Sequence, residues 1–120
     1  MPRTGPPVVL VVEDEALVRD YIATFLRDVG YPVLETDTAE HAIAMMDTGT
    51  RIDIVLTDIN LNGKLTGWDL AETFRAAQPE IPVIYVSGNP AEYDRLVPES
   101  VFFKKPYNAA AILRSLQEFT

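Results

Sequence analysis

The stretch Arg51-Ile52-Asp53-Ile54-Val55-Leu56-Thr57-Asp58 organises the rest of this chain. Its apolar, β-branched centre is too short for an ordinary helix and predicts a buried strand. The strand ends on Asp58, and the polar loop Asn60-Leu61-Asn62-Gly63-Lys64 follows. Ligand sites in open parallel sheets form just outside the carboxyl ends of the strands. Asp58 is therefore a candidate site residue, provided that other reactive side chains reach the same edge.

Four further apolar runs predict strands, and segments with apolar residues at helical spacing separate them. The additional predicted strands are 8–12, 32–36, 81–86 and 101–103. This alternation predicts a doubly wound α/β domain, in which helices cover both faces of a five-stranded parallel sheet. In the first helix the apolar residues at helical spacing are Leu17, Val18, Tyr21, Ile22, Phe25 and Val29. Asn89 and Pro98 bound a helix of at most about two turns, so we expect the fourth helix to be short or irregular.

The length and composition are those of one globular domain. The chain has 120 residues, 48% of them apolar, and no apolar run approaches the length of a membrane span. We expect a disordered N-terminal extension at residues 1–7 and the domain at residues 8–120. The sequence contains no cysteine, which excludes disulfides and thiolate metal sites and makes the cytoplasm the default location.

The formal net charge of −8 argues against direct binding to nucleic acid, whose phosphate backbone requires a basic surface. The same excess of acidic residues is compatible with binding a cation. For most of these carboxylates, a solvated surface is the simpler interpretation.

Polar and charged residues end four of the predicted strands: Glu13-Asp14, Asp58, Ser87 and Lys105. Because all strand ends of a parallel sheet point the same way, these residues should share one edge. Grouped carboxylates repel one another, and a divalent cation with oxygen ligands, such as Mg²⁺, would balance them. A carboxylate can also accept a phosphoryl group, whose charge the metal and Lys105 would neutralise. The set therefore predicts a phosphoryl-acceptor site.

These residues resemble a known family, the receiver domains of two-component response regulators. The resemblance extends from Val8 to Phe119. It is carried by Val-Val-Glu13-Asp14-Glu15, by Asp58 after Ile-Val-Leu-Thr, by Val-Ser87-Gly88, and by Lys105-Pro106 after Phe-Phe. It implies a flavodoxin-like sheet with the strand order 2-1-3-4-5.

The resemblance also implies roles for the residues at the acidic end of the site. Asp58 would be the phosphoacceptor and a ligand of Mg²⁺. Asp14 would bind the ion directly, and Glu13 would bind it largely through water. The main-chain carbonyl of Asn60 would supply a further ligand.

Other residues would bind the phosphoryl group or respond to it. Ser87 would be the switch hydroxyl and Lys105 the phosphate-binding cation, with a cis peptide bond between Lys105 and Pro106. The proline selects Lys105 over its neighbour Lys104, which we expect to face solvent. Phe102 matches the position of the family's aromatic rotamer switch.

The implied function is phosphorylation-dependent signalling. A histidine kinase or a histidine phosphotransfer protein would donate to Asp58, and a downstream protein target or output domain would respond to the change. Such a domain is not a conventional enzyme, although it assists its own aspartyl phosphorylation and dephosphorylation. We expect a monomer or weak dimer that contacts neither membrane nor nucleic acid directly.

One position and two intervals depart from the common pattern of the family. Asn62 stands where many receivers have proline, the interval from Asp58 to Gly67 is longer than usual, and the interval from Ser87 to Lys105 is shorter. The last departure, which shortens the fourth helix, leaves open a second class of function, a receiver-like protein-interaction module that is not phosphorylated. The near-complete set of acidic and basic site residues argues against this alternative. A phosphatase would need a second acid where Asn60 stands, and flavin binding has only fold analogy in its favour.

Overall fold

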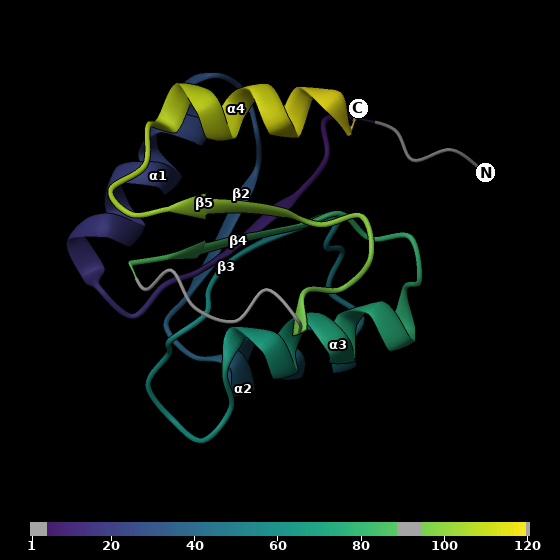
Figure 1. Ribbon diagram of the computed structural model, residues 1–120. Helices are drawn as coiled ribbons and strands as arrows, with labels where there is room; N and C mark the ends of the chain where they lie inside the picture. The colour runs from purple at the N-terminus through teal and green to yellow at the C-terminus, as the bar shows by residue number, and fades with distance from the viewer. Residues whose placement is uncertain (1–4, 89–94, 120) are drawn as a thin grey trace.

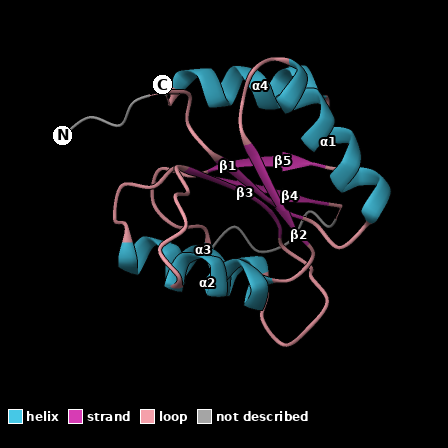
Figure 2. Cartoon of the chain, turned by 180° about the vertical axis from the view of Figure 1, so that it is seen from behind, coloured by secondary structure: helices cyan, strands magenta, loops and turns pink. Residues whose placement is uncertain are grey.

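The computed structural model of the protein describes residues 5–88 and 95–119. Along the chain the elements are β1 (Val9–Val12), α1 (Ala16–Asp28), β2 (Val33–Thr36), α2 (Ala39–Asp47), β3 (Ile54–Asp58), α3 (Gly67–Ala77), β4 (Val83–Ser87), β5 (Val101–Lys104) and α4 (Ala109–Glu118). All strand pairs are parallel, and the strand order is β2-β1-β3-β4-β5. Helices α1 and α4 cover one face of the sheet, and α2 and α3 cover the other (Figures 1 and 2). The predicted doubly wound fold and strand order are confirmed.

The central strands are buried along their whole length because helices cover both faces of the sheet. Every residue of β1, β3 and β4 is buried. Burial on both faces explains why these strands are continuous apolar runs rather than alternating ones. Their polar ends are therefore exceptions within an apolar layer.

Short polar signals define where the helices begin and end. Helix α1 is followed by Gly30, whose φ of 103° is a left-handed conformation that glycine adopts without strain. The Thr38 hydroxyl accepts a hydrogen bond from the backbone of His41 at the start of α2. At the start of α3, Thr66 and Asp69 form a reciprocal capping box.

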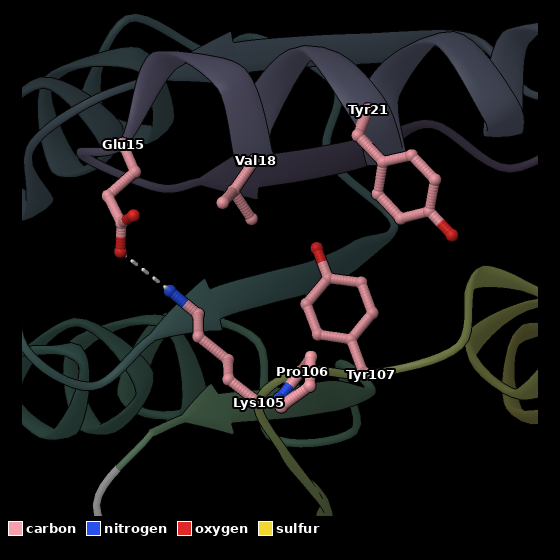
Figure 3. A pocket seen from close by; sticks show the side chains of 6 residues that line it. All are labelled: Glu15, Val18, Tyr21, Lys105, Pro106 and Tyr107. Atoms are coloured by element: carbon pink, nitrogen blue, oxygen red, sulfur yellow. Dashed lines mark ion pairs between the residues drawn. The ribbon is translucent and has the colours of Figure 1, made fainter.

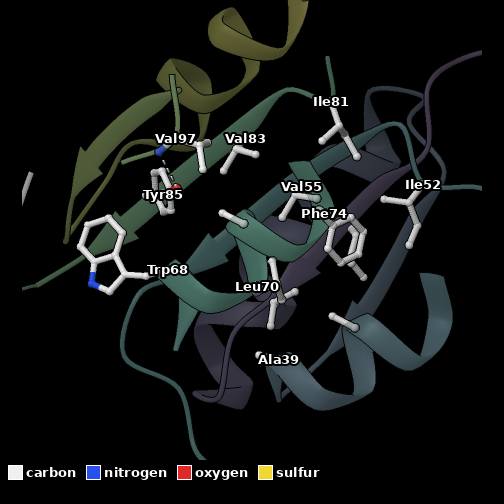
Figure 4. Packing of buried hydrophobic residues seen from close by; sticks show 14 of the residues in the cluster. Ala39, Ile52, Val55, Trp68, Leu70, Phe74, Ile81, Val83, Tyr85 and Val97 are labelled. Atoms are coloured by element: carbon white, nitrogen blue, oxygen red, sulfur yellow. Dashed lines mark hydrogen bonds between the residues drawn. The ribbon is translucent and has the colours of Figure 1, made fainter. Parts of the chain in front are cut away.

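Two hydrophobic clusters lie on opposite faces of the sheet. In the cluster on the α2 and α3 side, Trp68 packs against Tyr85 with ring centroids 5.1 Å apart, and Phe74 is fully buried (Figure 4). The cluster on the other side is built mainly from β-branched strand residues and from Ile22, Leu26 and other residues of α1 and α4.

In helix α1, two residues of the predicted apolar set are exposed rather than packed against the sheet. Leu17 is 86% exposed and Tyr21 is 51% exposed, whereas Ile22, Ala23 and Leu26 are buried. Helical spacing shows that apolar residues share a face, but it does not show which face meets the sheet. The start of α1 therefore leaves Leu17 largely exposed, while Tyr21 is half-exposed and lies beside Tyr107.

In its described part, the connection between β4 and β5 forms polar contacts with both α3 and β4. The guanidinium of Arg95 pairs with Asp69 and Glu72, and the Tyr85 hydroxyl accepts a hydrogen bond from the backbone of Val97. The helix expected from Asn89 falls mainly on residues 89–94, which lie outside the described residues. Residues 1–4 of the expected N-terminal extension also lie outside them. Among the helices of the described residues, none is long and apolar enough to cross a bilayer.

Candidate functional site

The carboxyl edge of the sheet brings the predicted site residues together. The register aligns Val12 with Thr57, and Asp58 with Val86, so β1, β3 and β4 end side by side. The chain leaves each of these strands on a polar residue. Glu13 is 2% exposed, Asp58 is 5% exposed and Ser87 is 1% exposed.

Lys105 joins the acidic residues of two strand ends. Its Nζ lies 2.7 Å from Glu13 Oε1, 2.7 Å from Asp58 Oδ2 and 3.5 Å from Glu15 Oε1. Burial lowers the pKa of Lys105, but hydrogen bonds to Asp58 and Glu13 outweigh this and hold that pKa above its ordinary value. The ammonium group is therefore charged at neutral pH, and it neutralises part of the acidic cluster.

The structure distinguishes the two neighbouring lysines. Lys104 ends β5 and is exposed, whereas Lys105 is partly buried among the carboxylates. The peptide bond between Lys105 and Pro106 is cis, as expected. The prediction that Lys104 faces solvent is confirmed.

Four carboxyl groups form the acidic cluster of this edge. Oxygen atoms of Glu13, Asp14, Glu15 and Asp58 lie within 4.8 Å of one another. Burial raises the pKa of Glu13 to about 7, despite hydrogen bonds from Lys105 and from the backbone of Glu15 that lower it. A cation would offset the repulsion within the cluster, and carboxylate oxygens are the ligands that Mg²⁺ prefers. The donor set fits Mg²⁺.

Glu15 is the member of this cluster to which the sequence assigned no role. Its carboxylate faces Lys105 although the side chain is 65% exposed. The only signal in the sequence is its position directly after Glu13 and Asp14, before the first helix. That signal does not distinguish a site residue from an exposed helix start.

Different partners hold the two carboxylate oxygens of Asp58. Oδ2 contacts Lys105, and Oδ1 accepts a hydrogen bond from the backbone N–H of Asn60 at 3.1 Å. The carboxylate is thereby fixed at the beginning of the β3–α3 loop. The predicted role of the Asn60 carbonyl as a metal ligand stays a prediction.

The two predicted switch residues lie on neighbouring strands. Ser87 ends β4, and its carbonyl accepts a hydrogen bond from the backbone N–H of Lys105 at 2.8 Å. Phe102 pairs with Tyr85 across β4 and β5 and packs against the cluster on the α2 and α3 side. These positions connect the acidic edge with that core, while the switching roles stay predictions.

A cavity of about 400 Å³ opens beside the acidic cluster, and Figure 3 shows its lining. The lining residues are Glu15, Val18, Tyr21, Lys105, Pro106 and Tyr107. The rings of Tyr21 and Tyr107 have centroids 6.3 Å apart. Glu15 belongs to the acidic cluster, and Lys105 contacts Asp58, so the cavity opens directly next to Asp58 and its partners.

The strand order and the acidic edge together define a flavodoxin-like α/β domain, whose polar site lies at the carboxyl ends of the strands. The family model of the response regulator receiver domain matches residues 9–117, and the chain belongs to this family. Receiver domains bind Mg²⁺ at an acidic pocket, and they interact with histidine kinases and output domains.

Individual relatives agree with the family assignment. The chain is 36% identical to the transcriptional regulatory protein AruR of Pseudomonas aeruginosa over 76% of this chain and 38% of AruR. It is 32% identical to the sensory transduction protein RegX3 of Mycobacterium tuberculosis over 91% of this chain and 48% of RegX3. The chain thus spans less than half the length of these two relatives.

A solved structure with the same fold covers nearly the whole chain. It is the response regulator receiver protein from Sinorhizobium medicae, with a TM-score of 0.90 and 29% identity. The match covers 95% of this chain and 94% of that one.

Proposed function

We propose that Asp58 accepts a phosphoryl group from the phosphohistidine of a histidine kinase or histidine phosphotransfer protein. The observation that carries this proposal is the placement of Asp58, whose carboxylate lies 2.7 Å from Lys105 Nζ within a cluster of four carboxyl groups. Glu13, Asp14 and Asp58, with the main-chain carbonyl of Asn60, would hold Mg²⁺. Bound Mg²⁺ supplies electrostatic stabilisation of the phosphoryl oxygens during the transfer.

The transfer exchanges one bond to phosphorus for another. A carboxylate oxygen of Asp58 attacks the phosphorus, and the bond from phosphorus to the donor imidazole nitrogen breaks. The nitrogen keeps the electron pair and takes up a proton. The Asn60 N–H orients the carboxylate for attack, and Lys105 stabilises the phosphoryl oxygens as they arrive.

The surface beside the cavity suits a protein donor. Leu17 and Tyr21 are exposed on α1, immediately after the acidic residues that precede this helix. An apolar surface at this position would bind the donor and bring its histidine to Asp58. We expect the domain to act in the cytoplasm as a monomer or weak dimer, with proteins as its direct partners.

The response to phosphorylation would start at Ser87 and Phe102. The Ser87 hydroxyl would bind the phosphoryl group, and Phe102 would turn inward. The balance between the conformations of the α4 face would then shift. The domain assists its own phosphorylation and dephosphorylation rather than turning over an external substrate, because Asn60 stands where a second acid would be needed.

The test is incubation with acetyl phosphate and Mg²⁺, followed by intact mass spectrometry. We expect one phosphoryl adduct on the wild type, none on Asp58→Asn, and a strongly reduced yield for Asp14→Asn. The Asp58→Asn variant keeps the size of the side chain while removing its nucleophilic oxygen. A folded wild type without an adduct, or an undiminished adduct on Asp58→Asn, would contradict the proposal and favour a non-phosphorylated interaction module.

A further inference from the structure

We propose that Glu40, a carboxylate of helix α2 outside the acidic cluster, is a positioning residue for the phosphoacceptor site. It would act by holding the β3–α3 loop, residues 59–66, in the path that places Asn60 against Asp58. This inference rests on the proposed function, because it concerns the same site.

The Glu40 side chain binds the backbone of the loop directly. Its Oε2 accepts hydrogen bonds from the backbone N–H of Lys64 at 2.9 Å and of Leu65 at 3.3 Å. Gly63 leaves room for the carboxylate, since a Cβ there would lie 2.9 Å from Glu40 Oε1. Gly63 also has a φ of 96°, so its missing side chain serves both the turn and the contact.

The hydrogen bonds from the loop keep Glu40 ionised. The backbone N–H of Lys64 is the main cause of a pKa of Glu40 below its ordinary value. The carboxylate is therefore charged at neutral pH, where hydrogen bonds to a charged acceptor are stronger than neutral ones.

A second contact with the start of α2 holds the tip of the loop. Thr38, the N-cap of α2, forms an isolated parallel bridge with Asn62. The strand-like bridge and the Glu40 carboxylate together fix the path of the loop.

The base of the loop is fixed at the phosphoacceptor itself. The backbone N–H of Gly67 donates to the Ile59 carbonyl at 2.8 Å, and the N–H of Asn60 donates to Asp58 Oδ1 at 3.1 Å. Asn60 therefore lies between a fixed base and a tip that α2 holds. Releasing the tip would give the loop more conformations and would weaken the alignment of the Asn60 peptide with Asp58.

The experiment compares Mg²⁺ binding by isothermal titration calorimetry in the wild type, Glu40→Ala, Glu40→Gln and Asp47→Ala. The Asp47→Ala variant removes an exposed carboxylate from the same helix and serves as the matched control. We expect Glu40→Ala to raise the dissociation constant of Mg²⁺ roughly tenfold, a typical effect of removing a residue that orients a ligand. Glu40→Gln keeps an acceptor oxygen and should restore most of the affinity, and Asp47→Ala should leave it unchanged.

Phosphorylation kinetics separate positioning from a general loss of structure. With acetyl phosphate, Glu40→Ala should need about tenfold more Mg²⁺ for half-maximal rate and approach the wild-type rate at saturating Mg²⁺. Circular dichroism checks the fold of each variant. Gly63→Ala would disturb the contact between Glu40 and the loop from the loop side. It therefore provides a second test if Glu40→Ala does not fold.

Different results would contradict the positioning role of Glu40 and the phosphoacceptor role of Asp58. If the wild type binds Mg²⁺ and is phosphorylated while Glu40→Ala behaves like Asp47→Ala, the positioning role is wrong and the phosphoacceptor role stands. An unchanged dissociation constant in Gly63→Ala would also overturn the positioning role. A wild type that takes no phosphoryl group contradicts the proposed function itself.

Discussion

Two of the loops at the acidic edge contribute to it in opposite ways. The β1–α1 connection, residues 13–15, is short, and each of its residues supplies a carboxyl group to the cluster. The β3–α3 loop is longer and binds Asp58 through a backbone N–H, while residues of α2 hold its tip. The short loop provides charge, and the long loop provides orientation.

The starts of the two following helices show the same division. Glu15 is the N-cap of α1 but makes no side-chain capping bond, and its carboxylate faces Lys105 instead. Thr66 is the N-cap of α3 and shares a complete capping box with Asp69. The Glu15 side chain, which could cap α1, is thus part of the acidic cluster. The Thr66 side chain instead caps α3 with both hydrogen bonds of the capping box.

Replacing Gly67 should disturb this arrangement most. A Cβ at this position would clash with the backbone carbonyl oxygen of Asp58, so either the loop or the end of β3 must move. We expect Gly67→Ala to lower the free energy of unfolding by about 3 kcal/mol, as measured by urea denaturation. The control is Gly88→Ala, where the added Cβ has no neighbour within 4 Å and the change should stay within about 1 kcal/mol. Equal losses in both variants would show that the close approach of Gly67 is not required.

Removing the two N-cap side chains should have a smaller and unequal effect. Thr66→Ala loses the capping box and should cost about 1 kcal/mol of unfolding free energy. Glu15→Ala removes no capping bond and should change stability by less than about 0.5 kcal/mol. Thermal or urea unfolding of both variants measures the difference. A larger loss in Glu15→Ala would contradict the proposed division between charge and orientation.

The smallest expected effect is the pH dependence of the α3 cap. The backbone N–H of Thr66 is the main cause of a pKa of Asp69 below its ordinary value of 3.8, and Arg95 lowers it further. A group with a lowered pKa in the folded state stabilises the protein above its ordinary pKa and loses this contribution as the pH falls further. The stability advantage of the wild type over Asp69→Asn should therefore be constant near neutral pH and shrink below about pH 4.

Unfolding curves recorded at a series of pH values, with Asp47→Asn as a control for the loss of one exposed carboxylate, test this dependence. An advantage that is unchanged down to pH 3 would show that the ionised Asp69 does not stabilise the cap.

The sequence predicted the short loop better than the long one for a physical reason. Because parallel strands end at one edge, polar residues at the ends of apolar runs were enough to bring Glu13, Asp58 and Lys105 together. The proline after Lys105 was enough to choose between two adjacent lysines. The spacing of Thr66 and Asp69 is that of a capping box, so the sequence also indicates the start of α3.

The path of the long loop depends on partners that no local pattern reveals. Glu40 precedes Lys64 by 24 residues and lies on an amphipathic helix, where an acidic residue usually indicates only an exposed face. The exposure of Leu17 and Tyr21 was missed for a related reason, since helical spacing does not fix the rotation of α1 against the sheet. Tertiary contacts decide both features.

The position of Lys105 has a consequence for the order of assembly. Many metal-binding domains need an ion from solution before their ligands can be packed together. Here a tethered ammonium group already neutralises part of the charge of Glu13 and Asp58, so the sheet can close over these acids before any ion binds. On the proposed function, the domain would therefore fold first and bind its ion afterwards, and binding and release of the ion would not require refolding.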